Sequence, residues 1–194
     1  KTSTTYNAFS SLSLPIVGNK LLGGHATLKG CFDEFVKPEI LDGDNAWFCP
    51  NCKYKRKASK TLRISRLPPV LIIHLKRFKR SKNIGMNKLE TPVDYPLRNL
   101  DLTKYWPQQK QHEFSQKEAN LLSHLPNRGQ NPPFIYDLRA VTLHHGSLKG
   151  GHYTAIAEKP GMGWFLFDDS IVTPVKEQAA ISKNAYVLVY QRRM

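Results

Sequence analysis

The sequence is poor in cysteine and in acidic residues, and it has no long apolar run. Its 194 residues include three cysteines, Cys31, Cys49 and Cys52. An odd count with a single Cys-x-x-Cys pair argues against a disulfide-rich secreted domain and favours a reducing, cytoplasmic setting. No apolar run approaches the roughly 18 residues of a membrane-spanning helix, so we expect no transmembrane segment.

The first residues also lack targeting signals. Lys1 to Thr5 contain neither an initiator methionine nor a signal-peptide pattern. We therefore expect the sequence to be an excised piece of an intracellular protein, with room for one domain or for part of a larger one.

Acidic residues are outnumbered by basic ones. Asp and Glu total 15 against 29 Lys and Arg, which gives a formal net charge of +14. This surplus permits contact with nucleic acids or anionic membranes. The basic residues are mostly scattered, however, and no RNA-binding signature is present, so we expect no nucleic-acid partner. A zinc-stabilised nucleic-acid binder remains an alternative, because the densest basic run, residues 53–60, follows a Cys-x-x-Cys pair.

The last third of the chain contains several strand patterns. β-Branched and aromatic residues, punctuated by Gly and Pro, predict three antiparallel strands over residues 137–143, 152–158 and 164–167. His152 begins the second strand and Asp168 follows the third. The turn between these strands can therefore bring the imidazole and the carboxylate side by side.

Such a contact would have a chemical use. A carboxylate on one ring nitrogen fixes the tautomer and leaves the other nitrogen free to take a proton from a nucleophile. Gly150 and Gly151, before the histidine, would let backbone approach closely, as a substrate tail in a narrow channel requires. The structural alternative is that His152 is a packed strand histidine and that Asp168 and Asp169 only begin a turn.

Other segments have simpler interpretations. Thr27 is predicted to cap a short helix that buries Cys31, which makes this cysteine a small hydrophobic residue rather than a nucleophile. Alternating or apolar patterns predict strands over residues 61–66, 70–78 and 185–191.

Cys49-Pro50-Asn51-Cys52 has the spacing of a zinc knuckle. A structural zinc site needs four ligands, and the sequence offers only this pair, with His25 as a conceivable third ligand. We predict that Cys49 and Cys52 form half of a zinc site. The alternative is a pair of reduced thiols left in a turn.

Four stretches together resemble the ubiquitin-specific protease family. Gly150 to Ala155 (GGHYTA), followed by Trp164 to Ser170 (WFLFDDS), is similar to the His box of that family. Three further stretches match in the order of the family: Trp47 to Cys52 (WFCPNC), Leu67 to Phe78 (LPPVLIIHLKRF) and Ala185 to Tyr190 (AYVLVY).

The resemblance implies an α+β, β-rich fold, a papain-like cysteine protease built from thumb, palm and fingers. Residues 1–66 would be mainly fingers and residues 67–194 mainly palm, with a variable insertion at 107–133. Members of the family hydrolyse the bond after the C-terminal glycine of ubiquitin and need no cofactor for catalysis. In members that bind zinc, a second Cys-x-x-Cys pair would fall just before Lys1.

The resemblance also implies roles for single residues. His152 would be the general base, Asp168 the residue that orients it, and Asp169 a polar helper. Tyr153 would line the channel for the ubiquitin tail together with Gly150 and Gly151. The segments 79–88 and 144–151 would be loops beside that channel, with His144 and His145 on the loop surface.

One departure from the family is serious. The nucleophilic cysteine of the family lies in a Gly-Asn-Thr-Cys box, and no such box is present here. We therefore expect the chain to lack the thumb and to be inactive as written, since thiolate attack requires the sulfur itself. Expected partners are ubiquitin, ubiquitinated proteins and the missing thumb of the same protein. A non-catalytic ubiquitin-binding module is the alternative.

Overall fold

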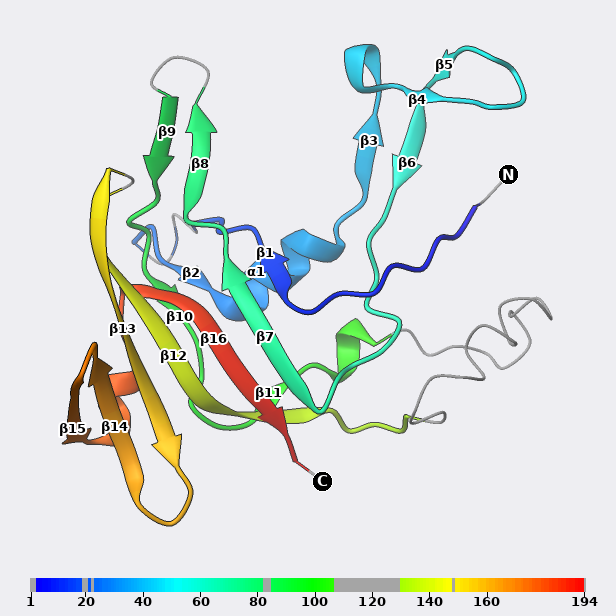
Figure 1. Cartoon of the computed structure of the whole chain (residues 1–194). Helices are drawn as coiled ribbons and strands as arrows, with labels where there is room; N and C mark the ends of the chain where they lie inside the picture. Colours follow the sequence, from blue (N-terminus) through cyan, green and yellow to red (C-terminus); the bar gives the residue numbers. More distant parts are fainter. Residues whose placement is uncertain are drawn as a thin grey trace.

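The fold is dominated by one mixed β-sheet (Figure 1). The computed structural model describes residues 3–18, 21, 23–81, 85–106, 130–147 and 149–193. The large sheet has eight strands in the order β1-β7-β16-β12-β13-β14-β15, with β11 paired to β12. These strands are β1 (Leu12–Leu14), β7 (Val70–Leu75), β11 (Leu100–Asp101), β12 (Ile135–Ser147), β13 (Gly150–Lys159), β14 (Gly163–Asp168), β15 (Ile171–Val175) and β16 (Ala185–Arg192). All neighbours are antiparallel except β1 and β7.

The central strands follow the alternation of their sequences. In β7, Leu71, Ile73 and Leu75 are fully buried, whereas Val70 and Ile72 on the other face are partly exposed. The predicted strand 70–78 is confirmed over its first six residues, but it ends at Leu75, and Phe78 begins the next strand. The predicted strand 185–191 is confirmed as β16.

The single α-helix of the described residues, α1 (Leu28–Val36), packs beside β1. The Thr27 hydroxyl accepts a hydrogen bond from the Gly30 N–H at 3.0 Å, the N-cap that the sequence predicts. Cys31 and Phe32 have no exposed surface, so the predicted burial of Cys31 is confirmed. The helix follows β2 (Ala26–Thr27), which pairs in parallel with β10 (Val93–Asp94).

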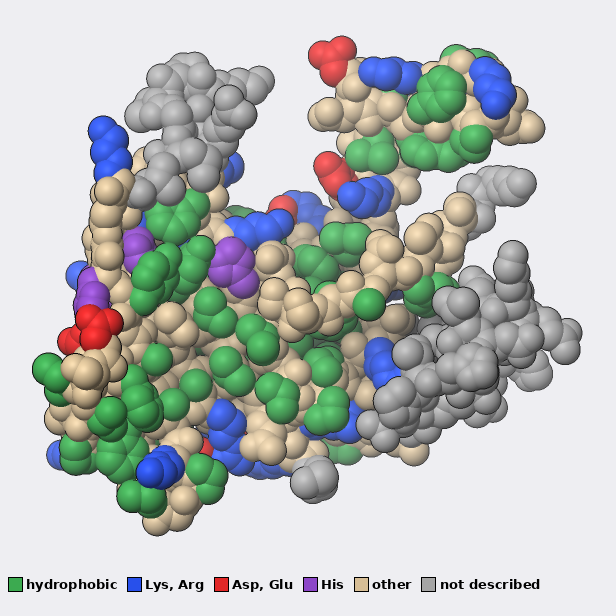
Figure 2. All heavy atoms as spheres, viewed as in Figure 1, with side chains coloured by type: hydrophobic (Ala, Val, Ile, Leu, Met, Phe, Trp, Pro, Cys, Tyr) green, Lys and Arg blue, Asp and Glu red, His purple; other side chains and the backbone are tan. Residues whose placement is uncertain are grey.

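The large sheet has two unlike faces. One contributes to a continuous buried core with α1. On the other face the strand registers place Ile72, Val189, Ala140, Ala157 and Phe165 in one row across five strands. Figure 2 shows hydrophobic side chains spread over this face. Its large members include Val70, Ile72, Phe167 and Val172, which are 36–54% exposed. We call it the apolar face.

Two short ribbons project from the body (Figure 1). They pair β3 (Glu39–Leu41) with β6 (Ala58–Lys60), and β4 (Trp47–Phe48) with β5 (Lys55–Arg56). The 3₁₀-helix η2 (Gly43–Asn45) connects β3 to β4. Between Glu39 and Lys60, Cys49 is the one buried residue. We call these strands the distal ribbons. The division into mainly fingers (residues 1–66) and mainly palm (residues 67–194) stays a prediction.

Two predicted segments differ in the structure. Residues 61–66 do not form a strand, and Leu62 is 44% exposed while Ile64 is buried. Alternation alone was misleading here because no neighbouring strand pairs with the segment. Residues 79–88 are not a simple loop, since β8 (Phe78–Ser81) pairs with β9 (Gly85–Lys88). The predicted insertion at 107–133 lies outside the described residues except for residues 130–133.

The predicted loop at 144–151 is also wrong, because β12 and β13 continue through it as a hairpin. His145 pairs with His152 and Gly146 with Gly151. Gly146 has φ 106°, and a Cβ there would lie 2.6 Å from the carbonyl oxygen of Gly150. This glycine therefore allows close strand pairing, which explains why a glycine-rich sequence forms a hairpin.

The remaining short elements complete the fold. They are the 3₁₀-helix η3 (Thr103–Tyr105) and the 3₁₀-helix η4 (Glu177–Ala180). Among the described residues, no helix is long and apolar enough to cross a membrane.

Candidate active site

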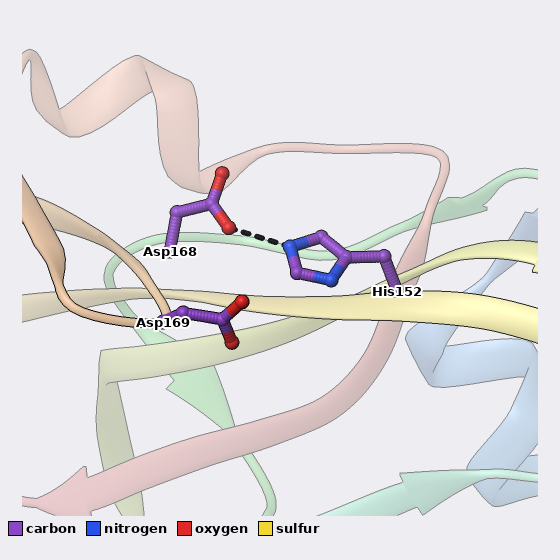
Figure 3. Close-up of side chains that lie close together, drawn as sticks. All are labelled: His152, Asp168 and Asp169. Carbon is purple, nitrogen blue, oxygen red and sulfur yellow. Dashed lines mark hydrogen bonds and ion pairs between the residues drawn. The ribbon is translucent and has the colours of Figure 1, made fainter.

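The predicted contact between His152 and Asp168 is confirmed by the structure (Figure 3). Ala155 pairs with Phe167, so the side chains of His152 on β13 and Asp168 at the end of β14 are diagonal neighbours. The His152 Nε2 atom lies 2.5 Å from Asp168 Oδ1, within hydrogen-bonding distance. The catalytic roles of these residues stay predictions.

The electrostatics of this pair favour a protonated imidazole. The hydrogen bond to Asp168 raises the pKa of His152 above its ordinary value, and the charges of Asp168 and Asp169 act in the same direction. The two side chains are 49% and 43% exposed, so the contact is open to solvent on one side. Because Nε2 is engaged by Asp168, Nδ1 is the ring nitrogen left to exchange a proton with another group.

Asp169 lies immediately after β14, with a left-handed φ of 50° that is uncommon for a residue other than glycine. Its carboxylate points toward the His152 ring in Figure 3. Ligand-type atoms of His152, Asp168 and Asp169 all lie within 4.8 Å of one another. This is the one cluster in the described part of the chain that could hold a metal ion, but the imidazole–carboxylate hydrogen bond already accounts for its geometry.

Tyr153 lies on the opposite side of β13 from His152, among other rings. Its centroid is 4.5 Å from that of His144 and 5.9 Å from that of Tyr186. Phe78 completes the group, 5.6 Å from His144. Tyr153 is 50% exposed, so one side of its ring is open to solvent. We call these four residues the aromatic group.

The expectation that His144 lies on a loop surface is wrong. His144 is 3% exposed, and burial lowers the pKa of its imidazole. Its Nδ1 atom has no hydrogen-bond partner among the described residues. His145, in contrast, is exposed and its Nδ1 lies 3.1 Å from the Asn184 side-chain nitrogen. Alternation along β12 separates the two neighbours, which could not be seen while the segment was taken for a loop.

Gly150 and Gly151 are placed differently. A Cβ on Gly151 would lie 2.4 Å from the Nε2 atom of His144, so a side chain there would collide with the aromatic group. Around Gly150, a Cβ would meet nothing within 4 Å. Gly151 therefore permits close packing beside His152, whereas Gly150 leaves open space at the start of β13.

Cys49 and Cys52 form a tight turn at the tip of the distal ribbons. The Cys49 sulfur accepts a hydrogen bond from the Cys52 N–H at 3.4 Å, and this bond lowers the pKa of the Cys49 thiol. The two cysteine thiols and the tight turn between them fit a zinc knuckle. Among the described residues, however, no third ligand joins the pair, and His25 lies near Asp94 instead, at 3.7 Å. The pair fits half of a zinc site and does not fit a complete one.

None of the three cysteines belongs to the cluster around His152. Cys31 is buried in α1, where burial raises the pKa of its thiol, so it is unsuited to nucleophilic attack. Cys49 and Cys52 are on the distal ribbons, away from the β12–β13 hairpin (Figure 1). The absence of a nucleophile beside the histidine stays a prediction.

Comparisons with known proteins give a consistent result. Residues 42–190 match the family model described as ubiquitin carboxyl-terminal hydrolase. Ubiquitin carboxyl-terminal hydrolase 4 of Candida glabrata is 46% identical over 194 residues, covering 99% of this chain and 20% of the relative. Human ubiquitin carboxyl-terminal hydrolase 19 is 43% identical over 184 residues, covering 91% of this chain and 12% of the relative. The chain thus spans at most about a fifth of the length of these relatives.

Solved structures show the same similarity. A SAGA DUB module bound to monoubiquitin has a chain that matches with a TM-score of 0.73 and 30% identity, covering 100% of this chain and 37% of that chain. A SAGA DUB module bound to ubiquitin aldehyde matches with a TM-score of 0.70 and 31% identity, covering 96% and 36% of the two chains.

Proposed function

Because the chain belongs to the ubiquitin carboxyl-terminal hydrolase family, we propose that it supplies the histidine–aspartate half of a deubiquitinating cysteine protease. The observation that carries this proposal is the short contact between His152 Nε2 and Asp168 Oδ1 at the end of two paired strands. Nothing in a purely structural strand would require an exposed imidazole to be held by a carboxylate and flanked by a second one.

The reaction would use a thiol from a segment outside this chain. His152 Nδ1 takes the thiol proton, and the sulfur bonds to the carbonyl carbon of the terminal glycine of ubiquitin. The C–N bond to the leaving amine then breaks as the imidazolium returns the proton to that amine. Water, activated by the same imidazole, hydrolyses the thioester and releases ubiquitin. Asp168 holds the ring orientation throughout, and Asp169 assists the attacked carbonyl or the water.

The apolar face offers a surface for the nucleophile-bearing thumb. A row of apolar side chains across five strands is unusual on a free sheet face. We propose that the thumb of the full-length protein packs there. The aromatic group lies on the same side of the sheet, since Tyr153 and Ala157 share one face of β13 by alternation. The interface would then lie beside the channel for the substrate.

That channel would receive the C-terminal tail of ubiquitin. The exposed ring of Tyr153 forms one wall, and the open space beside Gly150 allows an extended peptide to pass close to His152. The ubiquitin named in the structures of the similar SAGA DUB modules supports this choice of ligand. A reactive thiol is needed, so we propose a reducing, cytoplasmic location.

Cys49 and Cys52 are proposed to bind a structural zinc ion together with two ligands from outside the described residues. The hydrogen-bonded turn supplies two thiols, the ligand type that structural zinc sites use. Zinc would hold the distal ribbons together and would take no part in catalysis.

A second candidate function is a ubiquitin-binding module without catalysis. It is favoured by the separation of all three cysteines from His152 in this chain. The preserved contact between His152 and Asp168 weighs against it, because binding alone does not need a proton-transfer pair.

The test uses the full-length protein that contains this chain and a fluorogenic ubiquitin substrate. His152→Ala is expected to lower kcat by about 10⁴-fold or more while ubiquitin binding is retained, because the thiol loses its base. His145→Ala on the facing strand is the matched control and should stay close to the unsubstituted protein. Equal turnover in His152→Ala and the unsubstituted protein would exclude His152 as the base. Binding without turnover in the unsubstituted protein would favour the non-catalytic module.

A further inference from the structure

The hairpin that carries His152 extends beyond the strand that supports it. Pairing of β12 with β16 ends at Leu143 and Ala185, whereas pairing of β12 with β13 continues to Ser147. The end of β12 therefore has a neighbour on one side only. A two-stranded segment of this kind is weakly held unless something else takes the place of the missing strand.

The unpaired side of β12 is defined by its backbone hydrogen bonds. In an antiparallel ladder, the N–H and C=O of one residue point to the same neighbour, and successive residues alternate. The His144 N–H donates to the Asn184 carbonyl at 2.9 Å, so His144 faces the β16 side. By alternation Gly146 faces that side too, and both carbonyls lie where β16 has ended.

Lys88 occupies this position. Its ammonium donates to the Gly146 carbonyl at 2.7 Å and to the His144 carbonyl at 3.1 Å. The side chain of Lys88 is only 7% exposed, and the carboxylate of Glu90, 3.5 Å away, is 71% exposed. The nearly buried ammonium of Lys88 thus supplies the hydrogen bonds that a longer β16 would give to these two carbonyls.

Lys88 is itself held in place by a buried arginine. The Leu89 N–H donates to the Arg77 carbonyl at 2.6 Å, and the Arg77 guanidinium donates to the carbonyls of Leu89 at 3.0 Å and Thr91 at 2.9 Å. Arg77 is 1% exposed. The residues that follow Lys88 are therefore fixed to the core, and the ammonium acts from a rigid base.

We propose that Lys88 is a positioning residue for the reaction, which sets the location of Gly151 and His152 through β12. Gly146 pairs with Gly151, and His145 pairs with His152. Lys88 binds the carbonyl of Gly146 and the carbonyl of His144, the residue before His145. Loss of the ammonium frees both carbonyls and lets the hairpin end move. A displacement of about 1 Å at a general base is enough to lower a rate by about 100-fold. This inference rests on the proposed function.

The test compares Lys88→Met with Lys159→Met in the full-length protein. Lys159 is an exposed lysine at the far end of β13, and its substitution is the matched control. Lys88→Met is expected to lower kcat by about 10–100-fold. Its equilibrium affinity for ubiquitin should be unchanged, because the buried side chain does not reach a ligand. Amide exchange of residues 144–147 and 150–153 should become faster, while that of residues 185–192 stays the same.

A second variant keeps the test decisive if Lys88→Met does not fold. Lys88→Gln retains a neutral N–H donor, and its kcat should lie between those of Lys88→Met and the unsubstituted protein. Unchanged kcat in folded Lys88→Met or Lys88→Gln would overturn the positioning role, as would a loss of ubiquitin affinity that accounts for the whole effect. An unsubstituted protein that does not hydrolyse the substrate would refute the proposed function itself, and the catalytic role of Lys88 with it.

Discussion

The large sheet and the distal ribbons are both built from paired strands, yet they are stabilised in different ways. β7 has neighbours on both sides and buries Leu71, Ile73 and Leu75 completely. The distal ribbons have two strands each and bury only Cys49, while Trp47 and Phe48 are 46% and 55% exposed. The sheet is supported by its own core, whereas isolated two-stranded ribbons are marginal in water.

This difference separates two kinds of site. The contact between His152 and Asp168 is exposed, but both residues extend from strands of the large sheet, so its geometry is present without a ligand. The pair of Cys49 and Cys52 is preformed only as a local turn and needs ligands from elsewhere. Geometry near a core can be fixed by the chain alone, whereas geometry on a ribbon depends on what binds it.

The largest effect on stability is expected from replacing Arg77, a buried arginine that follows β7. The same substitution at an arginine of the distal ribbons should have a much smaller effect. Arg77 is 1% exposed and donates to the carbonyls of Leu89, Thr91, Lys183 and Ala185. Each buried carbonyl left without a donor costs about 1–3 kcal/mol, so Arg77→Met should lower the free energy of unfolding by at least about 3 kcal/mol. Denaturant unfolding of the chain measures this difference.

Arg56→Met is the matched control on the distal ribbons. Arg56 is exposed and contacts Tyr54 through a hydrogen bond and a cation–π contact. Its loss should change the free energy of unfolding by no more than about 0.5–1 kcal/mol. Similar losses for Arg77→Met and Arg56→Met would refute the view that the large sheet alone carries the stability.

The second prediction concerns metal removal. In a full-length protein that supplies two more ligands, we expect one zinc ion per chain and none after Cys52→Ser. Zinc at 100 times its dissociation constant stabilises by about 2.7 kcal/mol, so chelation should speed amide exchange of residues 47–56 by about 100-fold. Exchange of residues 185–192 in β16 should not change. One zinc per two copies of the isolated chain would instead show that two cysteine pairs meet in a dimer.

Much of the large sheet could be predicted from the sequence. Residues 70–75 and 185–191 alternate or are strongly apolar, and their burial decides their structure. The hairpin at 144–151 could not be predicted, because Gly146, Gly150 and Gly151 resemble a loop in sequence. Their effect depends on close contact between two strands, which local patterns do not report.

The candidate site shows the same limit. The contact of His152 with Asp168 could be predicted because both residues lie at the ends of neighbouring strands. Lys88 could not, since it lies 56 and 58 residues from the carbonyls of His144 and Gly146 that it binds. Within a basic stretch it has no distinguishing local signal. Only the position where β16 ends gives it a role.

The smallest effect is expected from Asp168→Asn. Asp168 is the main cause of the raised pKa of His152, and Asp169 contributes less. The pKa of His152, followed by NMR titration of its ring protons, should therefore fall in Asp168→Asn and fall less in Asp169→Asn. A larger fall in Asp169→Asn would show that Asp169 is the principal partner.

The same shift fixes the sign of the dependence of stability on pH. A histidine whose pKa is higher in the folded chain than in the unfolded chain stabilises the fold fully below the unfolded value of about 6.5. This contribution is lost as pH rises through the folded value. The difference in stability between the unsubstituted chain and Asp168→Asn should thus be larger at pH 5.5 than at pH 9. It should remain small, since solvent reaches both side chains. A stability difference that grows with pH would contradict an imidazolium–carboxylate contact. The geometry of His152 and Asp168 would then depend on outside partners, as that of the distal ribbons does.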